Sequence, residues 1–293
     1  MIRGLYKSIR RVSLSVLLGG ALLFGAPPAV AKHIKEDDGT SSKTRLLFPI
    51  MNPERGRILF LRKGCVSCHS INDTGGDVGP ALDAPAGNRI MNPFSFAANM
   101  WNHAPAMIAA QEDKLGEQVH FTGEELGNII AFIHDIDVQK KFGTPDASKR
   151  DILAVSRLRL IMPIMNPDRG RSVFVNKGCV TCHAVNGIGG DDAPALDAHA
   201  KEMLVNPFAF AAKMWDHAPG MIAAQEEELG EQLVFTGQEL ADITAFMHDA
   251  HAQRDFERSD LTPRIRKMMS KMGGHGEDDD DGHEEEAPKA DKD

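Results

Sequence analysis

The chain has 293 residues, of which 42% are hydrophobic, and its formal net charge at pH 7 is −9. This length is sufficient for two domains of ordinary size, each with its own hydrophobic core. The acidic balance, without a basic stripe interleaved with aromatic residues, argues against a nucleic-acid-binding protein.

Residues 1–31 have the pattern of a signal peptide. Four basic residues precede an apolar stretch from Val12 to Phe24, and Ala29-Val30-Ala31 forms a small-residue cleavage site. The apolar stretch is shorter than the roughly 20 residues that a membrane-spanning helix needs, which argues against an uncleaved anchor. We therefore expect cleavage after Ala31, a periplasmic location, and no transmembrane segment in the mature chain. Residues 32–44 would form an N-terminal extension.

The following part of the chain contains a sequence unit that is repeated once at a constant offset, which indicates a duplicated domain. Ile50-Met51-Asn52-Pro53 returns as Ile164-Met165-Asn166-Pro167, and Phe121-Thr122-Gly123 returns as Phe235-Thr236-Gly237. We expect a first domain over residues 45–142, a linker over 143–158 and a second domain over 159–255.

Each unit has the pattern of a small helical domain. In the first unit, Asn52-Pro53 predicts a helix start, with an N-cap followed by proline at the first helical position, and Gly64 ends this helix. A second helix is expected from Asn92-Pro93. A last helix begins with a capping box of Thr122 and Glu125. Its apolar face has helical spacing and consists of Leu126, Ile129, Ile130 and Ile133. No run of residues has a clear strand pattern.

Residues 256–293 form a C-terminal extension with two parts of different composition. The segment from Leu261 to Met272 carries four basic side chains and could form a short helix or an unattached linker. From Gly273 to Asp293, ten acidic residues are accompanied by only two basic ones. Such a charged tract cannot bury enough apolar surface to fold, so we expect a disordered tail.

All four cysteines lie in two C-x-x-C-H motifs. This is the attachment signature of haem c, in which two thiols bind the porphyrin and the adjoining histidine can bind the iron. A thioredoxin-like dithiol does not require the histidine, and a zinc site would need a further ligand at each motif. The motifs therefore predict two haem c groups. The expected attachment points are Cys65, Cys68, Cys179 and Cys182, and the expected iron ligands are His69 and His183.

The order of helices and motif resembles a class I cytochrome c domain, and the resemblance covers both units almost completely. In that family, an N-terminal helix carrying glycine and an aromatic residue crosses the C-terminal helix. The matching residues are Gly56, Phe60 and Phe132 in the first unit and Gly170, Phe174 and Phe246 in the second. The resemblance implies an all-α fold of two tandem class I cytochrome c domains, each wrapped around a covalently bound haem c.

The resemblance also implies residues that support the haem without binding the iron. The family's haem-proximal proline, whose carbonyl accepts a hydrogen bond from the ligating imidazole, falls on Pro80 and Pro194. Ala193 stands where the first unit has Gly79, which weakens the turn argument in the second unit. Trp101 and Trp215 could be core residues or could donate an indole N–H to a haem propionate.

The residue in the sixth coordination position of each iron decides between electron transfer and catalysis. The family usually presents a methionine between its middle and last helices, and Met107 and Met221 suit this best because each follows a proline. His103 and His217 are the runners-up. Met100 and Met214 are the third candidates for the sixth ligand, since a methionine on a regular helix more often fills the core.

These features favour a periplasmic dihaem c-type cytochrome that carries single electrons between a redox donor and acceptor, such as a membrane or periplasmic oxidoreductase. Histidine–methionine ligation would leave no site for peroxide or oxygen. The enzyme alternative is a dihaem peroxidase, which needs unlike haems, whereas both units carry the same candidate ligands. A third hypothesis is a cytochrome subunit of a larger periplasmic oxidoreductase.

Overall fold

The computed structural model describes residues 45–85, 90–144, 156–198 and 204–272. The expected signal peptide, N-terminal extension and acidic tail, and most of the expected linker, lie outside the described residues. Everything that is described belongs to one compact unit, residues 41–293. Among the described helices, none combines the length and the apolar character needed to span a bilayer.

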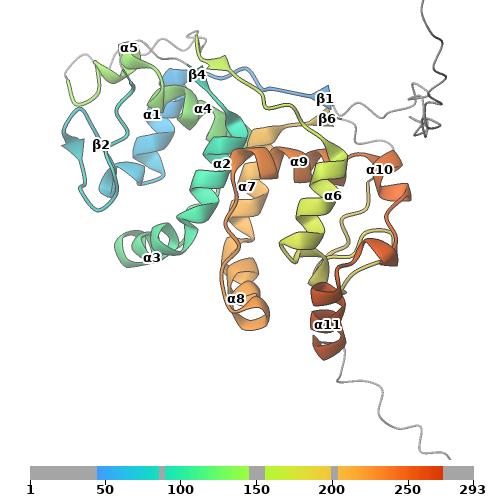
Figure 1. The fold of residues 1–293 in the computed structure, drawn as a ribbon. Helices are drawn as coiled ribbons and strands as arrows, with labels where there is room; N and C mark the ends of the chain where they lie inside the picture. The colour runs from blue at the N-terminus through green and yellow to red at the C-terminus, as the bar shows by residue number, and fades with distance from the viewer. Residues whose placement is uncertain (1–44, 86–89, 145–155, 199–203, 273–293) are drawn as a thin grey trace, which may run out of the picture. The chain divides into compact units, whose positions relative to one another are not determined.

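The two repeats have the same order of helices (Figure 1). The first repeat contains α1 (Pro53–Arg62), the 3-10 turn η1 (Cys65–Ser67), α2 (Pro93–Asn102), α3 (Ala104–Leu115), α4 (Gly123–Ile133) and α5 (Ile136–Gln139). The second contains α6 (Pro167–Asn176), η3 (Cys179–Thr181), α7 (Pro207–Asp216), α8 (Ala218–Leu229), α9 (Gly237–Met247) and α10 (Ala250–Arg254). The 3-10 turn η4 (Arg258–Asp260) and helix α11 (Pro263–Met272) follow.

Local capping explains where the helices begin, as the sequence predicts. The Asn52 side chain accepts a hydrogen bond from the Arg55 N–H, and Pro53 is the first residue of α1. At the start of α4, both hydrogen bonds of the capping box between Thr122 and Glu125 are present. The middle helical region is divided into α2 and α3 just before Pro105, whose ring is incompatible with a continuous helix.

The crossing of α1 with α4, and of α6 with α9, confirms the resemblance. A Cβ atom on Gly56 would lie 1.9 Å from the carbonyl oxygen of Asn128, so only glycine allows α1 and α4 to approach this closely. The rings of Phe60 and Phe132 pack beside this contact, with centroids 5.5 Å apart. Gly170 stands in the same relation to Asp242 in the second repeat.

The described residues include six short strands, which the sequence did not predict. A hairpin pairs β2 (Ser70–Ile71) with β3 (Thr74–Gly75), directly after the first C-x-x-C-H motif. Two parallel pairs join the repeats: β1 (Arg45–Leu46) with β6 (Leu204–Val205), and β4 (Ile90–Met91) with β5 (Arg159–Leu160). A strand of two residues is too short for an alternating pattern, and in the two parallel pairs the partner strand lies far away in the sequence.

The repeats share one hydrophobic core. Helix α2 packs against both α7 and α9 of the second repeat, and α4 packs against α7 (Figure 1). The buried face of α2 contains alanines that allow close approach, and α7 has the same pattern. The shared core includes Phe94, Ala97, Ala98, Trp101, Phe208, Ala211, Ala212 and Trp215. The middle helix of each repeat is therefore as much a part of the other repeat's core as of its own.

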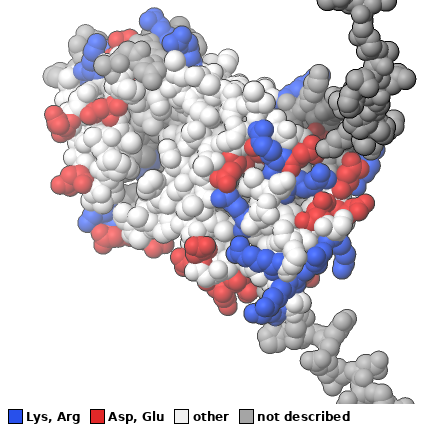
Figure 2. All heavy atoms as spheres, in the orientation of Figure 1, with Lys and Arg blue, Asp and Glu red and all other residues white. Residues whose placement is uncertain are grey.

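The segment after the second repeat forms a docked helix, which decides between the two sequence hypotheses. Helix α11 packs against η3 and buries Ile265, with Met268 and Met269 half-buried beside it. Its exposed face carries Arg264, Arg266, Lys267 and Lys271, in the region where Figure 2 shows a concentration of basic side chains. Val180 and Thr181 of η3 are buried, whereas the corresponding Val66 is half-buried and Ser67 is exposed.

Candidate functional site

A glycine in the left-handed region precedes the C-x-x-C-H motif of each repeat. Gly64 has φ of 76° and ends α1, and Cys65 then starts η1. The peptide N–H of His69 donates to the Cys65 carbonyl over 2.9 Å, which closes the turn. Gly178, with φ of 89°, precedes Cys179 in the same way. Because other residues rarely adopt this conformation, glycine is suited to the turn from helix to motif.

Cys65, Cys68 and His69 line a cavity of about 700 Å³ in the first repeat. This size is typical of a pocket for a small molecule or cofactor. The walls come from α1, η1, α2, α3, α4 and the loop after the motif, and they are mostly apolar. Among the lining residues are Phe60, Pro80, Leu82, Met100, His103, Met107, Phe121 and Ile129.

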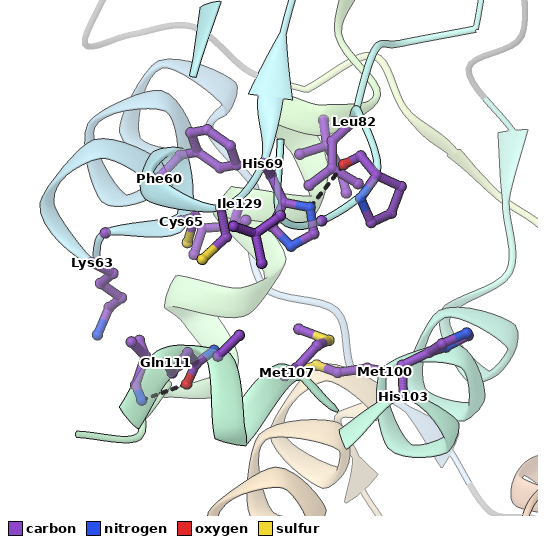
Figure 3. Close-up of a pocket in the computed structure, with 18 of the residues that line it drawn as sticks. Phe60, Lys63, Cys65, His69, Leu82, Met100, His103, Met107, Gln111 and Ile129 are labelled. Carbon is purple, nitrogen blue, oxygen red and sulfur yellow. Dashed lines mark hydrogen bonds between the residues drawn. The ribbon is translucent and has the colours of Figure 1, made fainter. Parts of the chain in front are cut away.

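The histidine of each motif is oriented by a backbone carbonyl. Nδ1 of His69 lies 2.8 Å from the carbonyl oxygen of Pro80, as the dashed line in Figure 3 shows. His183 and Pro194 make the same contact, also at 2.8 Å, so Ala193 does not alter it. A carbonyl oxygen can only accept, so Nδ1 donates its proton and Nε2 is left with a lone pair that can bind a metal.

The side of the cavity opposite His69 carries two methionines. Figure 3 shows the thioethers of Met107 and Met100 on this side, whereas the ring of His103 is directed away from His69. His103 is exposed, and its Nδ1 lies 2.7 Å from the Asn99 carbonyl within the same helical turn. In the second repeat His217 is likewise exposed and Met221 is half-buried.

Burial affects the acidity of three of the motif thiols, those of Cys65, Cys179 and Cys182. Burial raises the pKa of Cys65 to about 11 and that of Cys179 to about 12, and it also raises the pKa of Cys182. A reactive dithiol has a lowered thiol pKa, so these environments do not resemble that of a redox-active dithiol. Within the described residues, no group of three His, Cys, Asp or Glu side chains is arranged to hold a metal ion.

Trp101 and Trp215 are buried core residues whose indole N–H groups bind backbone carbonyls. Neither indole lines the cavity of the first repeat. The Trp101 indole N–H donates to the Leu233 carbonyl, and the Trp215 indole N–H donates to the Val119 carbonyl, each over 2.6 Å. Both acceptors belong to the other repeat. The packing of α2 on the second repeat and of α7 on the first thus engages both indole N–H groups in hydrogen bonds within the protein.

Two glutamines that sequence reasoning missed hold the loops that contain Pro80 and Pro194, whose carbonyls contact His69 and His183. The Gln139 side-chain oxygen accepts from the Ala84 N–H at 2.6 Å, and its amide donates to the Leu82 carbonyl at 2.9 Å. Gln253 makes both bonds in the second repeat, with the same distances. The sequence did contain a signal, because Gln139 and Gln253 are separated by the same offset as the two repeats. Both glutamines lie after the segments in which the repeats match most clearly.

Comparisons with known proteins agree with this geometry. The family model for cytochrome c matches the chain twice, over residues 53–137 and 167–251. The matches begin at the first residues of α1 and α6 and end within α5 and α10. No curated protein and no solved structure matches the chain significantly.

Proposed function

The chain belongs to the cytochrome c family, and from this premise we propose that it is a periplasmic dihaem cytochrome that carries single electrons between redox partner proteins. Each of its two cytochrome c domains binds one haem c with its iron, and such domains imply haem-based electron transfer. The observation that carries the proposal is the placement of thiols, histidine and methionine around one apolar cavity. A redox protein donor and a redox protein acceptor are the partners that this activity requires.

The residues of the first cavity fit a covalently attached haem. Cys65 and Cys68 would form the two thioether links, and His69 would bind the iron through Nε2, since Nδ1 is engaged by Pro80. We assign the same roles to Cys179, Cys182 and His183, with Pro194 as the hydrogen-bond acceptor. When bound, the haem iron supplies a site for one-electron oxidation and reduction, and the surrounding apolar side chains exclude water from it.

Met107 and Met221 are the proposed sixth ligands. Met107 lies on α3, two residues after Pro105. Its thioether lies on the side of the cavity opposite His69 (Figure 3). His103 is less suitable because it is exposed and held by the Asn99 carbonyl. A neutral thioether favours Fe(II) and closes the coordination sphere, which suits an electron carrier rather than a catalyst. Met100 is the nearest competitor in the first repeat.

The ligand assignment is tested by the far-red absorption band that methionine-ligated ferric haem shows. We expect the band in the native protein, with about half its intensity lost in Met107→Ala and about half in Met221→Ala, since each variant removes one of two ligands. Met100→Ala and His103→Ala are the matched controls and should retain the band. Retention of the full band in Met107→Ala, or its loss in Met100→Ala, would contradict the assignment.

The carrier proposal is distinguished from a peroxidase by the access of small ligands to the iron. Both repeats place the same candidate ligands in corresponding positions, which supports two closed haems rather than one closed and one open haem. We expect no carbon monoxide binding by the reduced native protein and no peroxide turnover. Either activity in the native protein would favour the enzyme, and co-purification with a larger oxidoreductase in fixed stoichiometry would indicate a subunit.

Export is tested by the mass of the protein purified from the periplasmic fraction. The expected mass is that of the chain cleaved after Ala31 with two haems attached. A mass that includes residues 1–31, or recovery from the cytoplasm with free thiols, would contradict the proposed location.

A further inference from the structure

The wall of the first haem cavity is held by a tryptophan of the second repeat. Trp215 of α7 donates its indole N–H to the Val119 carbonyl over 2.6 Å, and Val119 lines the cavity. The peptide N–H of Val119 in turn donates to the Gln111 side-chain oxygen over 2.8 Å (Figure 3). Gln111 also lines the cavity and lies one turn beyond Met107 on α3. Trp215 is therefore connected to the ligand-bearing helix through two hydrogen bonds.

Further contacts hold the same tryptophan against the same segment. The Trp215 ring packs against Phe121, with centroids 6.3 Å apart, and Phe121 is another lining residue of the cavity. Gln118 donates its side-chain amide to the Trp215 carbonyl at 2.8 Å. The segment between α3 and α4 thus contacts Trp215 through an indole hydrogen bond, a ring contact and a hydrogen bond to the backbone.

The second repeat has the same arrangement with the roles exchanged. Trp101 of α2 donates its indole N–H to the Leu233 carbonyl, and the Leu233 N–H donates to the Gln225 side chain at 2.9 Å. Gln232 donates to the Trp101 carbonyl at 2.9 Å, and Phe235 packs against the indole at 6.2 Å. Each of these residues occupies the position that corresponds to its counterpart in the first repeat. The tryptophan of each repeat therefore contacts the segment between the last two long helices of the other repeat.

Both indoles lie in the core that the repeats share. Trp101 and Trp215 are each only 2% exposed. Backbone from the two repeats is in direct contact nearby, since a Cβ on Gly123 would lie 2.7 Å from the Ala209 backbone of α7. The wall segment therefore has little freedom to move independently of the other repeat. Burial and hydrogen bonding around a haem are among the factors that set its potential.

We propose that each haem pocket is completed by the tryptophan of the other repeat, so that Trp215 tunes the haem attached to Cys65 and Cys68, and Trp101 tunes the haem attached to Cys179 and Cys182. The tryptophans are positioning residues, because they act through Val119 and Gln111, or their counterparts, and do not contact the ligating histidines. The inference rests on the proposed haem sites. According to this inference, the contact between the repeats helps to set the reduction potentials of both haems.

The test compares Trp215→Phe with Trp101→Phe in the full haem-loaded protein. Phenylalanine keeps an aromatic ring but has no N–H donor. Trp215→Phe therefore removes the hydrogen bond to the Val119 carbonyl, and Trp101→Phe removes the one to the Leu233 carbonyl. The ratio of reduced to oxidised haem is followed for each site by NMR during a redox titration, with resonances assigned through isotope-labelled thioether cysteines. At a fixed solution potential, we expect Trp215→Phe to change this ratio by about threefold at the first-repeat haem only, and Trp101→Phe to do so at the second only.

Phe48→Leu is the matched control, because Phe48 makes an aromatic contact with Phe208 of the second repeat but does not line the cavity. It should lower the melting temperature without changing either ratio. The inference is wrong if each tryptophan variant affects the haem of its own repeat, both haems equally, or neither haem.

If the tryptophan variants do not fold, the native protein still provides a test. The indole N–H resonance of Trp215 should titrate with the first-repeat haem, and that of Trp101 with the second. The reverse assignment would overturn the inference. Failure of the carrier proposal has a different signature, namely carbon monoxide binding or peroxide turnover by the native protein.

Discussion

At the scale of single residues, the position of His69, the proposed iron ligand, depends on a side chain distant in sequence. Gln139 is only 1% exposed and holds both the Leu82 carbonyl and the Ala84 N–H. These groups belong to the loop that begins at Pro80, whose carbonyl accepts from His69. The glutamine therefore maintains the loop whose carbonyl orients the imidazole.

Replacing Gln139 by leucine should destabilise the protein, because two partly buried backbone groups would lose their partners. We expect the free energy of unfolding to fall by roughly 2–4 kcal/mol, measured by guanidinium unfolding followed by circular dichroism. Gln253→Leu should have a similar effect in the second repeat. Lys140→Ala, at an exposed neighbouring position, should change stability by less than about 0.5 kcal/mol. Equal stability of Gln139→Leu and Lys140→Ala would refute this role.

At the scale of helices, the crossing of α1 and α4 requires the absence of a side chain. In Gly56→Ala the new methyl group would meet the Asn128 carbonyl at 1.9 Å, and because this atom belongs to the backbone the helices must separate. We expect a loss of at least about 2 kcal/mol in the free energy of unfolding.

Gly220→Ala provides the matched control on α8. No atom lies within 4 Å of the added Cβ, and the first repeat has Ala106 at the same position. Alanine restricts the unfolded chain and favours helix, so we expect a gain of roughly 0.5–1 kcal/mol. Thermal unfolding of the two variants should therefore shift in opposite directions, and a shift in the same direction would contradict the packing argument.

The capping boxes of α4 and α9 make stability depend on pH. Burial acts to raise the pKa of Glu125, but the hydrogen bonds from the Thr122 N–H and Lys63 outweigh it and hold the pKa below its ordinary value of 4.5. Glu239 has a lowered pKa for the same reasons, with Thr236 and Lys177. Because the folded state binds these protons less tightly than the unfolded state, the stabilisation is present above pH 4.5 and is lost as the pH falls through the folded pKa.

The double variant Glu125→Gln, Glu239→Gln should accordingly lose less stability on acidification than the native protein. The measurement is the free energy of unfolding at neutral pH and below pH 4.5, the ordinary value for these carboxyls. An unchanged difference between the two conditions would show that the capping glutamates do not contribute to the pH dependence.

At the scale of the whole molecule, the two haem domains are not independent units joined by a linker. Gly123 and Gly237 each start the last helix of one repeat against the backbone of the other repeat's middle helix. A Cβ on Gly237 would lie 2.6 Å from the Ser95 backbone nitrogen of α2. The parallel strand pairs β1–β6 and β4–β5 add backbone hydrogen bonds between the repeats.

We therefore expect the repeats to unfold in one cooperative transition. Gly123→Ala should force α4 away from Ala209 of α7 and lower the melting temperature of both repeats together. The measurement is calorimetry combined with the visible spectra of the two haems, with calorimetric and van't Hoff enthalpies expected to agree. Two separate transitions, with only the first repeat affected by the variant, would show that the domains fold independently.

The sequence by itself determined the features that depend on neighbouring residues. The C-x-x-C-H motifs are contiguous, so attachment points and one iron ligand are predicted without knowledge of the fold, and they stay predictions until the haem adducts are identified. The starts of α1, α2 and α4 were predicted correctly, because the hydrogen bonds of an N-cap or capping box span only three residues. The duplication and the family resemblance followed from the same local patterns.

Only the tertiary structure decided which apolar surfaces meet. The buried faces of α2 and α7 have nearly the same composition, so the sequence does not distinguish packing within a repeat from packing between repeats. For this reason the roles of Trp101 and Trp215, the short inter-repeat strands and the docking of α11 could not be predicted. The physical cause is that hydrophobic attraction is non-directional, and the partner is selected by shape and by distant hydrogen-bond acceptors such as the Val119 and Leu233 carbonyls.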